Sequence, residues 1–167
     1  MEFTLRRFSL EDVESVARYA NNEKIACKLR DVFPHPYSAD DAVSYIESCI
    51  SRDEQVLCRA IDVEGAAIGS IGVFPGGDIY RKSAELGYWL GEEFWGLGIM
   101  SEAVRRICAK AFEKFDIVRI FAEPFAHNAG SRRVLEKAGF TCEGTMKCGV
   151  YKNGIIYDYC MYALLRE

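Results

Sequence analysis

A glycine-broken loop between an apolar strand and a helix constrains this chain more than any other feature. The strand reads AELGYWL from Ala84 to Leu90, the loop reads GEEFWGLG, and a helix of roughly four turns follows. Gly96 and Gly98 flank the start of that helix. The first unpaired N–H groups of the helix and the positive end of its dipole therefore face whatever the loop holds. This order predicts a site where backbone groups bind a phosphate-bearing ligand.

Chain length and net charge restrict the class of protein that could contain this site. The chain has 167 residues, half of them apolar, which fits a single domain over residues 1–167 with one core. Its net charge of −4 gives no positive field to attract nucleic acid or anionic lipid. Charges interrupt the opening MEFTLRRFSL, and no apolar run approaches about 18 residues. Binding of nucleic acid by bulk charge, secretion and membrane spanning are all disfavoured.

The cysteines indicate a reducing compartment. There are seven of them, widely spaced and without a CxxC pair, and the chain has two histidines. This pattern predicts a cytoplasmic protein with reduced thiols and without a metal site. The simplest interpretation of the cysteines is as small, buried apolar side chains.

Turn and cap signals divide the first half of the chain. Ser9 and Asp12 form a capping-box pattern, and Ser38 precedes a second helix after a proline-containing elbow that we expect to be non-helical. The predicted elements are a strand at Phe3–Arg7, a helix from about Asp12, a helix at Ala39–Arg52, and antiparallel strands at Gln55–Asp62, Ala66–Phe74 and Ser83–Leu90.

In the second half, helices and strands alternate before a terminal hairpin. The predicted elements are a helix at Gly98–Phe115, a strand at Ile117–Ala122, a helix at Ala129–Ala138, and strands at Cys142–Tyr151 and Ile155–Leu165 that turn at Asn153-Gly154. This order predicts an α/β (α+β) fold: a mixed, mostly antiparallel twisted sheet of about seven strands with helices on both faces.

The parallel pair in this sheet is the predicted ligand cleft, because ligands enter such sheets at the carboxyl ends of parallel strands. That end is the loop Gly91–Gly98, beside the end of the Ile117–Ala122 strand. If the two strands splay apart, the backbone edge of Tyr88–Leu90 can pair with an extended ligand arm that carries amides. Pantetheine is such an arm.

Together these motifs resemble the GNAT N-acetyltransferases, in the branch of ribosomal-protein N-alpha-acetyltransferases and spermidine-type acetyltransferases. The resemblance covers nearly the whole chain. The matching motifs, in order, are ELGYWL (Glu85–Leu90), WGLGIMSEA (Trp95–Ala103), N-x-x-S (Asn128–Ser131), KAGF (Lys137–Phe140) and NG…YDYCMYALL from Asn153.

The resemblance implies acetyl-CoA as cosubstrate and no metal. It implies that the backbone of Tyr88–Leu90 pairs with pantetheine, that the amides of Trp95–Ser101 hold the pyrophosphate, and that Asn128 contacts the cofactor arm. The cofactor-binding residues so predicted are Tyr88, Trp89, Leu90, Trp95, Gly96, Leu97, Gly98, Ile99, Met100, Ser101 and Asn128.

Acetyl transfer to an amine requires three groups besides the binding site. They are an N–H donor aimed at the thioester oxygen, an acceptor for the amine's proton, and a proton donor for the departing thiolate. The N–H near Leu90 could be the first, and Glu85 on the same strand is the predicted acceptor, directly or through water. The structural alternative for Glu85 is a salt bridge or an edge charge that limits aggregation.

The proton donor is left open by the sequence. Many members of the family have a tyrosine seven residues after the asparagine, and this chain has Leu135 there. Ser131 is the predicted substitute, with a first-turn hydrogen bond to backbone as its structural alternative. Further donors are Tyr151, Tyr157 and Tyr159. We expect a Leu135→Tyr substitution to raise the rate if a missing acid limits turnover.

Other residues near the motifs have structural alternatives. Trp89 is expected in the core and Trp95 at the ligand. Arg132 and Arg133 either meet the ribose phosphate of the cofactor or form a solvated helix face. The elbow Asp31–Tyr37 is the predicted acceptor contact, because stiff loops over a rigid sheet often set specificity.

Two nucleotide-binding motifs are excluded. A dinucleotide fingerprint starting at Gly96 would need a glycine where Ser101 stands, and it would open a βαβ unit rather than follow antiparallel strands. A Walker loop is excluded because the chain contains no GK[ST] sequence.

The predicted function is therefore an acetyl-CoA-dependent N-acetyltransferase. Its acceptor is a primary amine, such as a peptide or protein N-terminal alpha-amine, a polyamine or an aminoglycoside, and the resemblance favours the alpha-amine. The alternative is a catalytically weak acyl-CoA sensor or interaction module of the same fold, for which Leu135 is the main support. The apolar terminal hairpin from Cys142 could provide a homodimer edge.

Overall fold

The computed structural model describes every residue from Met1 to Glu167 and divides into two compact units. The first unit consists of Met1–Gly72 and Tyr88–Ile99, and the second of Val73–Gly87 and Met100–Glu167. Hydrogen bonding connects the strands in the order β1-β2-β3-β4-β5-β7-β6, and the predicted seven-stranded mixed sheet is confirmed. None of the helices combines the length and apolar character that crossing a bilayer requires.

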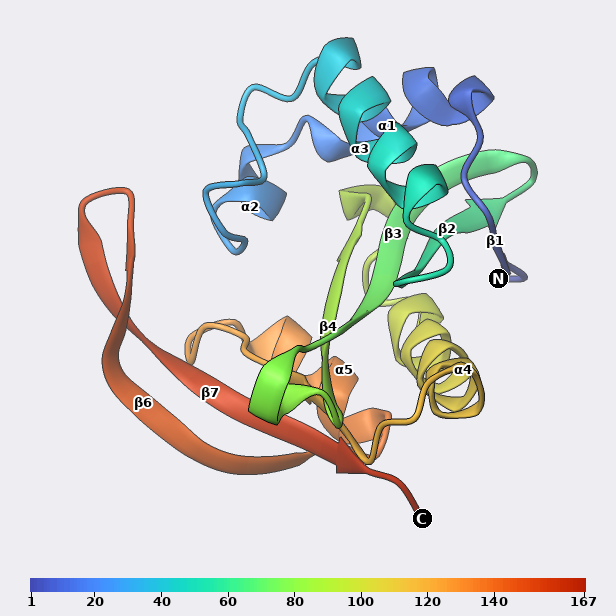
Figure 1. Cartoon of the computed structure of the whole chain (residues 1–167). Helices are drawn as coiled ribbons and strands as arrows, with labels where there is room; N and C mark the ends of the chain where they lie inside the picture. The colour runs from blue at the N-terminus through green and yellow to red at the C-terminus, as the bar shows by residue number, and fades with distance from the viewer. The chain divides into compact units, whose positions relative to one another are not determined.

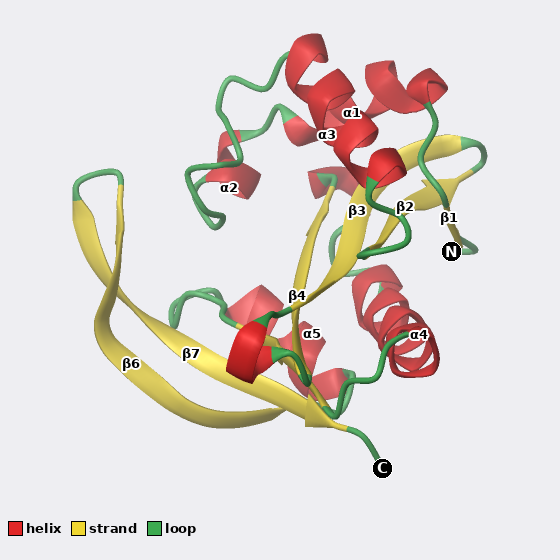
Figure 2. Cartoon of the chain, in the orientation of Figure 1, coloured by secondary structure: helices red, strands yellow, loops and turns green.

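Figure 2 shows how helices and strands follow one another along the chain. The strands are β1 (Thr4–Arg6), β2 (Leu57–Val63), β3 (Ala66–Pro75), β4 (Ser83–Leu90), β5 (Arg119–Ala122), β6 (Thr141–Lys152) and β7 (Ile155–Leu165). The α-helices are α1 (Val13–Ala20), α2 (Glu23–Ala26), α3 (Ala39–Ser51), α4 (Ile99–Lys114) and α5 (Ala129–Lys137).

In the first unit an ion-paired network connects β1 and β2. The two strands pair in antiparallel register from Thr4↔Asp62 to Arg6↔Ala60. The Arg6 guanidinium donates to Asp62 at 2.7 Å and to both carboxylate oxygens of Asp12 at 2.7 and 2.8 Å. The Ser9 N–H also donates to Asp12, as the capping-box pattern predicts. Burial raises the pKa of Asp12, but the hydrogen bonds from Arg6 and Ser9 outweigh it and lower the pKa overall.

In the second unit β4 and β5 are parallel, and the other pairs are antiparallel. The parallel register runs from Ser83↔Arg119 to Glu85↔Phe121, and β4 continues beyond it to Leu90. This short register agrees with the predicted divergence of the two strands. β6 and β7 form the long curved hairpin drawn in orange and red in Figure 1. Asn153 and Gly154 make its turn with φ of 51° and 80°, as the Asn-Gly pair predicts.

Most predicted elements are correct to within a few residues, and β4 and β7 match their predicted bounds. α4 begins one residue later than predicted, because Gly98 adopts a left-handed φ of 79° that no α-helix can include. The proline-containing elbow Asp31–Tyr37 is non-helical, as predicted, but the short helix α2, which lies between α1 and this elbow, was not predicted (Figure 2). Asn22 caps this one-turn helix by accepting a hydrogen bond from the Lys24 N–H at 2.9 Å.

All seven cysteines are free thiols. Cys49, Cys58, Cys108 and Cys160 are buried, as the sequence interpretation expected. That interpretation is wrong for Cys142 and Cys148, which are exposed on β6.

Candidate functional site

Hydrogen bonds anchor the first part of the loop after β4 within the first unit. At its start, the Gly91 N–H donates to the Ile68 carbonyl of β3 at 2.8 Å. A Cβ at Gly91 would lie 3.0 Å from the Tyr19 ring and 3.2 Å from the Ile68 carbonyl, so a larger residue would have to displace these neighbours by a few tenths of an ångström. A one-turn 3-10 helix, Glu92–Phe94, then turns the chain toward Trp95.

Trp95 closes this loop back onto the end of β4. Its indole N–H donates to the Leu90 carbonyl at 2.8 Å, and the Lys28 ammonium lies 4.7 Å from the centroid of its ring. Trp95 is 38% exposed, whereas Trp89 is 7% exposed and packs edge-on against Phe33. Trp89 is therefore a core residue, as expected, and Trp95 is partly exposed on the loop, where its contact with the ligand stays a prediction.

The last part of the loop leaves room for a ligand. Gly96 and Gly98 have φ of 76° and 79°, and a Cβ at either position would meet nothing within 4 Å. Both residues, like Leu97 between them, are exposed. α4 begins directly afterwards at Ile99 and is 16 residues long, so its first N–H groups and its dipole are available to an anion. A backbone cradle of this kind can hold a pyrophosphate, and the binding of that group by Trp95–Ser101 stays a prediction.

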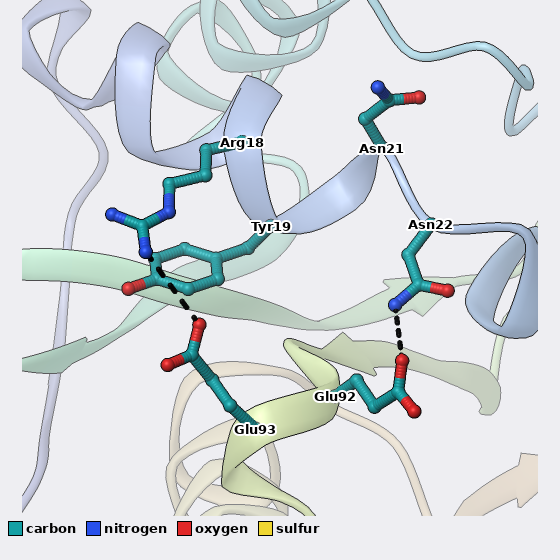
Figure 3. Close-up of a pocket in the computed structure, with 6 residues that line it drawn as sticks. All are labelled: Arg18, Tyr19, Asn21, Asn22, Glu92 and Glu93. Atoms are coloured by element: carbon teal, nitrogen blue, oxygen red, sulfur yellow. Dashed lines mark hydrogen bonds and ion pairs between the residues drawn. The ribbon is translucent and has the colours of Figure 1, made fainter.

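Hydrogen bonds and ion pairs connect the α1–α2 segment with the same loop (Figure 3). The Glu92 carboxylate accepts from Asn22 Nδ2 at 2.8 Å and pairs with the Lys24 ammonium. These hydrogen bonds, that from Lys24 first, lower the pKa of Glu92. Arg18 pairs with Glu93 at 3.9 Å, but both side chains are largely exposed, so this ion pair contributes little to stability.

These residues surround a pocket that the sequence analysis did not predict. It has a volume of about 450 Å³, and its lining residues are Arg18, Tyr19, Asn21, Asn22, Glu92 and Glu93. None of the predicted binding residues lines this pocket. The GEEF segment of the loop could have indicated carboxylates there, but the partners on α1 and α2 are about 70 residues away in sequence and carry no shared motif.

In the second unit, Asn128 and Ser131 lie together at the start of α5. Asn128 is the N-cap residue, and its side-chain oxygen accepts the Ser131 N–H at 3.2 Å. The asparagine therefore has a structural role in addition to the cofactor contact that the sequence predicts. Glu85, the predicted proton acceptor, is half-buried on β4 opposite Phe121 of β5.

Leu135 is fully buried in α5. A Leu135→Tyr substitution would have to fit a larger, polar side chain into a packed core, where overpacking costs about 1–3 kcal/mol. The substitution is therefore a poor test for a missing proton donor, contrary to the expectation from sequence.

The tyrosines named as further donors have different surroundings. Tyr151 is 71% exposed beside the turn of the β6–β7 hairpin. Tyr157 stacks on Phe125 with a centroid distance of 5.8 Å and lies 4.6 Å from the His127 ring. Tyr159 is half-buried on β7. Tyr159 also forms a backbone bridge with Phe125, but among the three tyrosines Tyr157 is the one with ring contacts to the segment that precedes Asn128.

Arg132 has a structural role that the sequence analysis did not consider. Its guanidinium donates to the Tyr162 hydroxyl at 3.0 Å and to the Ala126 carbonyl at 3.1 Å. The Tyr162 hydroxyl in turn donates to Glu136 at 2.8 Å. Arg132 therefore anchors the segment before α5, and its contact with the ribose phosphate of the cofactor stays a prediction, whereas Arg133 is exposed as expected for a solvated face.

Comparisons with known proteins agree with this geometry. Residues 2–141 match the family model described as an acetyltransferase (GNAT) domain. The chain is 32% identical over 171 residues to the putative ribosomal N-acetyltransferase YdaF of Bacillus subtilis strain 168, an alignment that covers 98% of this chain and 91% of that protein.

Two solved structures extend the comparison. The structure titled RimL, a ribosomal L7/L12 alpha-N-protein acetyltransferase in complex with coenzyme A, has a TM-score of 0.86 and 25% identity, and the match covers 98% of this chain and 93% of that one. The microcin C7 self immunity acetyltransferase MccE, in complex with acetyl-CoA and AMP, has a TM-score of 0.83 and 26% identity, with 99% and 93% covered.

Proposed function

The chain belongs to the GNAT family of acetyl-CoA-dependent N-acetyltransferases, and we propose that its acceptor is the N-terminal alpha-amine of a protein or peptide, with ribosomal proteins as the substrate class. The similarity over 98% of the chain to a putative ribosomal N-acetyltransferase carries this proposal. The likeness to an alpha-N-protein acetyltransferase of ribosomal L7/L12 supports the same class.

We propose that acetyl-CoA binds to the backbone between the end of β4 and the start of α4. Gly96 and Gly98 leave the start of α4 open to the pyrophosphate, and Trp95 fixes the preceding backbone at Leu90. The edge of Tyr88–Leu90 supplies backbone groups for the pantetheine amides. Met100, Ser101 and Asn128 complete the proposed set of cofactor-binding residues.

In the proposed reaction, the acceptor amine attacks the carbonyl carbon of the acetyl-CoA thioester. A C–N bond forms, the C–S bond breaks, and the amine loses a proton while the departing thiolate gains one. Glu85 is the proposed acceptor of the amine's proton, and a backbone N–H near Leu90 is the proposed donor to the carbonyl oxygen. Ser131 is the proposed donor to the thiolate, and Tyr157 is the alternative.

The decisive experiment mixes the full chain and acetyl-CoA with a panel of amines and follows release of the CoA thiol. The panel contains peptides that start with the N-terminal residues of ribosomal proteins, the same peptides with a blocked alpha-amine, a polyamine and an aminoglycoside. We expect thiol release with the free peptides and a product that is heavier by one acetyl group at the alpha-amine. Equal rates with free and blocked peptides, or turnover confined to the polyamine or the aminoglycoside, would contradict the proposed acceptor.

The alternative is a sensor that binds acyl-CoA without turnover. A fully buried leucine at the position of the usual tyrosine is the observation that favours it. Tight binding of acetyl-CoA without thiol release from any amine in the panel would favour this alternative.

A further inference from the structure

A pair of buried thiols lies in the first unit and has no role in the proposed reaction. Cys49, near the end of α3, and Cys58, in β2, are 8% and 2% exposed. The Cys49 thiol donates to the Cys58 sulfur, and the two Sγ atoms are 2.9 Å apart. Since a disulfide bond is about 2.05 Å long, the sulfurs have to approach by less than about 1 Å to form one.

Two hydroxyl groups lie close to the Cys58 sulfur. The Tyr45 hydroxyl of α3 lies 3.3 Å from its sulfur, and the Ser70 hydroxyl of β3 lies 3.8 Å away. Tyr45 and Ser70 are also hydrogen-bonded to each other at 2.6 Å. The Cys58 sulfur therefore accepts a hydrogen bond from Cys49 and lies within hydrogen-bond distance of both hydroxyls, in a small polar network inside an otherwise apolar core.

This network makes the two thiols chemically unequal. The hydrogen bond from Cys49 opposes the effect of burial and, with those from Tyr45 and Ser70, lowers the pKa of the Cys58 thiol. Donation of that same hydrogen bond, together with burial, raises the pKa of Cys49. Because the thiolate is the reactive form, Cys58 is the nucleophile of the pair and Cys49 is placed to resolve its oxidised form.

We propose that Cys49 and Cys58 are a redox-active pair that hydrogen peroxide converts to a reversible disulfide. The Cys58 thiolate attacks one peroxide oxygen, so that an S–O bond forms, the O–O bond breaks and hydroxide leaves. The Cys49 sulfur then attacks the Cys58 sulfenic acid, an S–S bond forms, and the S–O bond breaks. The departing hydroxide takes the proton of Cys49, so two thiols and one peroxide give one disulfide and two waters in total.

We expect formation of this disulfide to change the backbone position at the end of β4. Ser70, a member of the network, follows Gly69 on β3. A Cβ at Gly69 would lie 2.5 Å from the Trp89 carbonyl, so the backbones of β3 and β4 are in direct contact there. Movement of the network can therefore shift Trp89 and Leu90. This consequence for cofactor binding rests on the proposed function.

The test uses the full chain, treated with a small excess of hydrogen peroxide and then blocked with N-ethylmaleimide. Non-reducing peptide mapping identifies the disulfide, and a second sample is reduced with dithiothreitol before blocking. We expect a Cys49–Cys58 disulfide that disappears on reduction. Oxidation confined to the exposed Cys142 and Cys148, or both core thiols still blocked by maleimide after denaturation, would overturn the proposal.

Variants separate the roles of the two thiols. In Cys49→Ser, a sulfenic acid on Cys58 should persist and react with dimedone, whereas Cys58→Ser should give no dimedone adduct at Cys49. Cys108→Ser is the matched control, because Cys108 is also buried and burial raises the pKa of its thiol to about 12. This control should form the Cys49–Cys58 disulfide as the wild type does.

Acetyl-CoA affinity is measured on the same reduced and oxidised samples. We expect at least a threefold change in Kd on disulfide formation, reversed by dithiothreitol. An unchanged Kd at complete disulfide formation would overturn the effect on β4. Failure of the reduced protein to bind acetyl-CoA would count against the proposed function and leave the mapped disulfide as an independent result.

Discussion

At the scale of single residues, the Trp95 indole is the side chain that organises the proposed cofactor loop. A Trp95→Phe substitution keeps an aromatic ring near Lys28 but removes the N–H that donates to the Leu90 carbonyl. A lost hydrogen bond of this kind costs about 1 kcal/mol, so we expect acetyl-CoA to bind about fivefold more weakly. Isothermal titration measures this change. Lys28→Met is the matched control for the cation–π contact, and equal Kd values for Trp95→Phe and wild type would contradict the role of the indole N–H.

Asn128 combines a helix cap with the predicted contact to the cofactor arm, and two substitutions separate these roles. Asn128→Ala removes the cap and should lower the free energy of unfolding by about 1 kcal/mol. Asn128→Ser keeps a capping oxygen and should change stability by a few tenths of a kcal/mol. If the asparagine also contacts the cofactor, both variants bind acetyl-CoA more weakly in calorimetric titrations. Wild-type affinity in Asn128→Ser would mean that the residue is only a cap.

At the scale of elements, the contact between β3 and β4 depends on Gly69. A Cβ there would lie 2.5 Å from the Trp89 carbonyl and 3.1 Å from the Leu90 Cα, both of which are backbone atoms that cannot rotate away. Gly69→Ala should therefore cost about 1–3 kcal/mol of stability and weaken acetyl-CoA binding. Gly77→Ala is the control, because its φ of −123° suits alanine and its Cβ would meet nothing within 4 Å. Similar unfolding midpoints for the two variants in urea would contradict this account.

Elements with local sequence signals could be predicted from the sequence, and those that depend on tertiary contacts could not. β4, its glycine loop and the Asn-Gly turn were predictable, because apolar runs and positive-φ positions are local signals. α2 was missed because a four-residue helix has no amphipathic period, and its cap, Asn22, is followed by no apolar repeat. The ion pair between Lys24 and Glu92 was not predictable, because the two residues are far apart in sequence. The contact between Cys49 and Cys58 was not predictable either, because no sequence motif relates the two cysteines and they meet only through tertiary packing.

At the scale of the whole molecule, acid stability should depend on the Arg6 network. Folding lowers the pKa of Asp12, so its carboxylate contributes stability above its unfolded pKa of about 3.9, and this contribution is lost as pH falls through the lower folded value. Asp12→Asn should lower the free energy of unfolding by about 1–2 kcal/mol at pH 7. The difference from wild type should shrink below pH 3.9. Urea titrations at several pH values measure this difference in the free energy of unfolding. A difference that stays constant down to pH 2 would contradict a stabilising role of the Asp12 carboxylate.

The central claim is that this fold holds acetyl-CoA through the backbone after β4 and at the start of α4. Isothermal titration of the reduced full chain with acetyl-CoA and with CoA tests it most directly, because it requires no knowledge of the acceptor. The account predicts one binding site per chain for each ligand, and weaker binding in Trp95→Phe at unchanged stoichiometry. Absence of binding for both ligands to correctly folded protein would contradict the cofactor assignment, and with it the proposed roles of Tyr88–Leu90 and Trp95–Ser101.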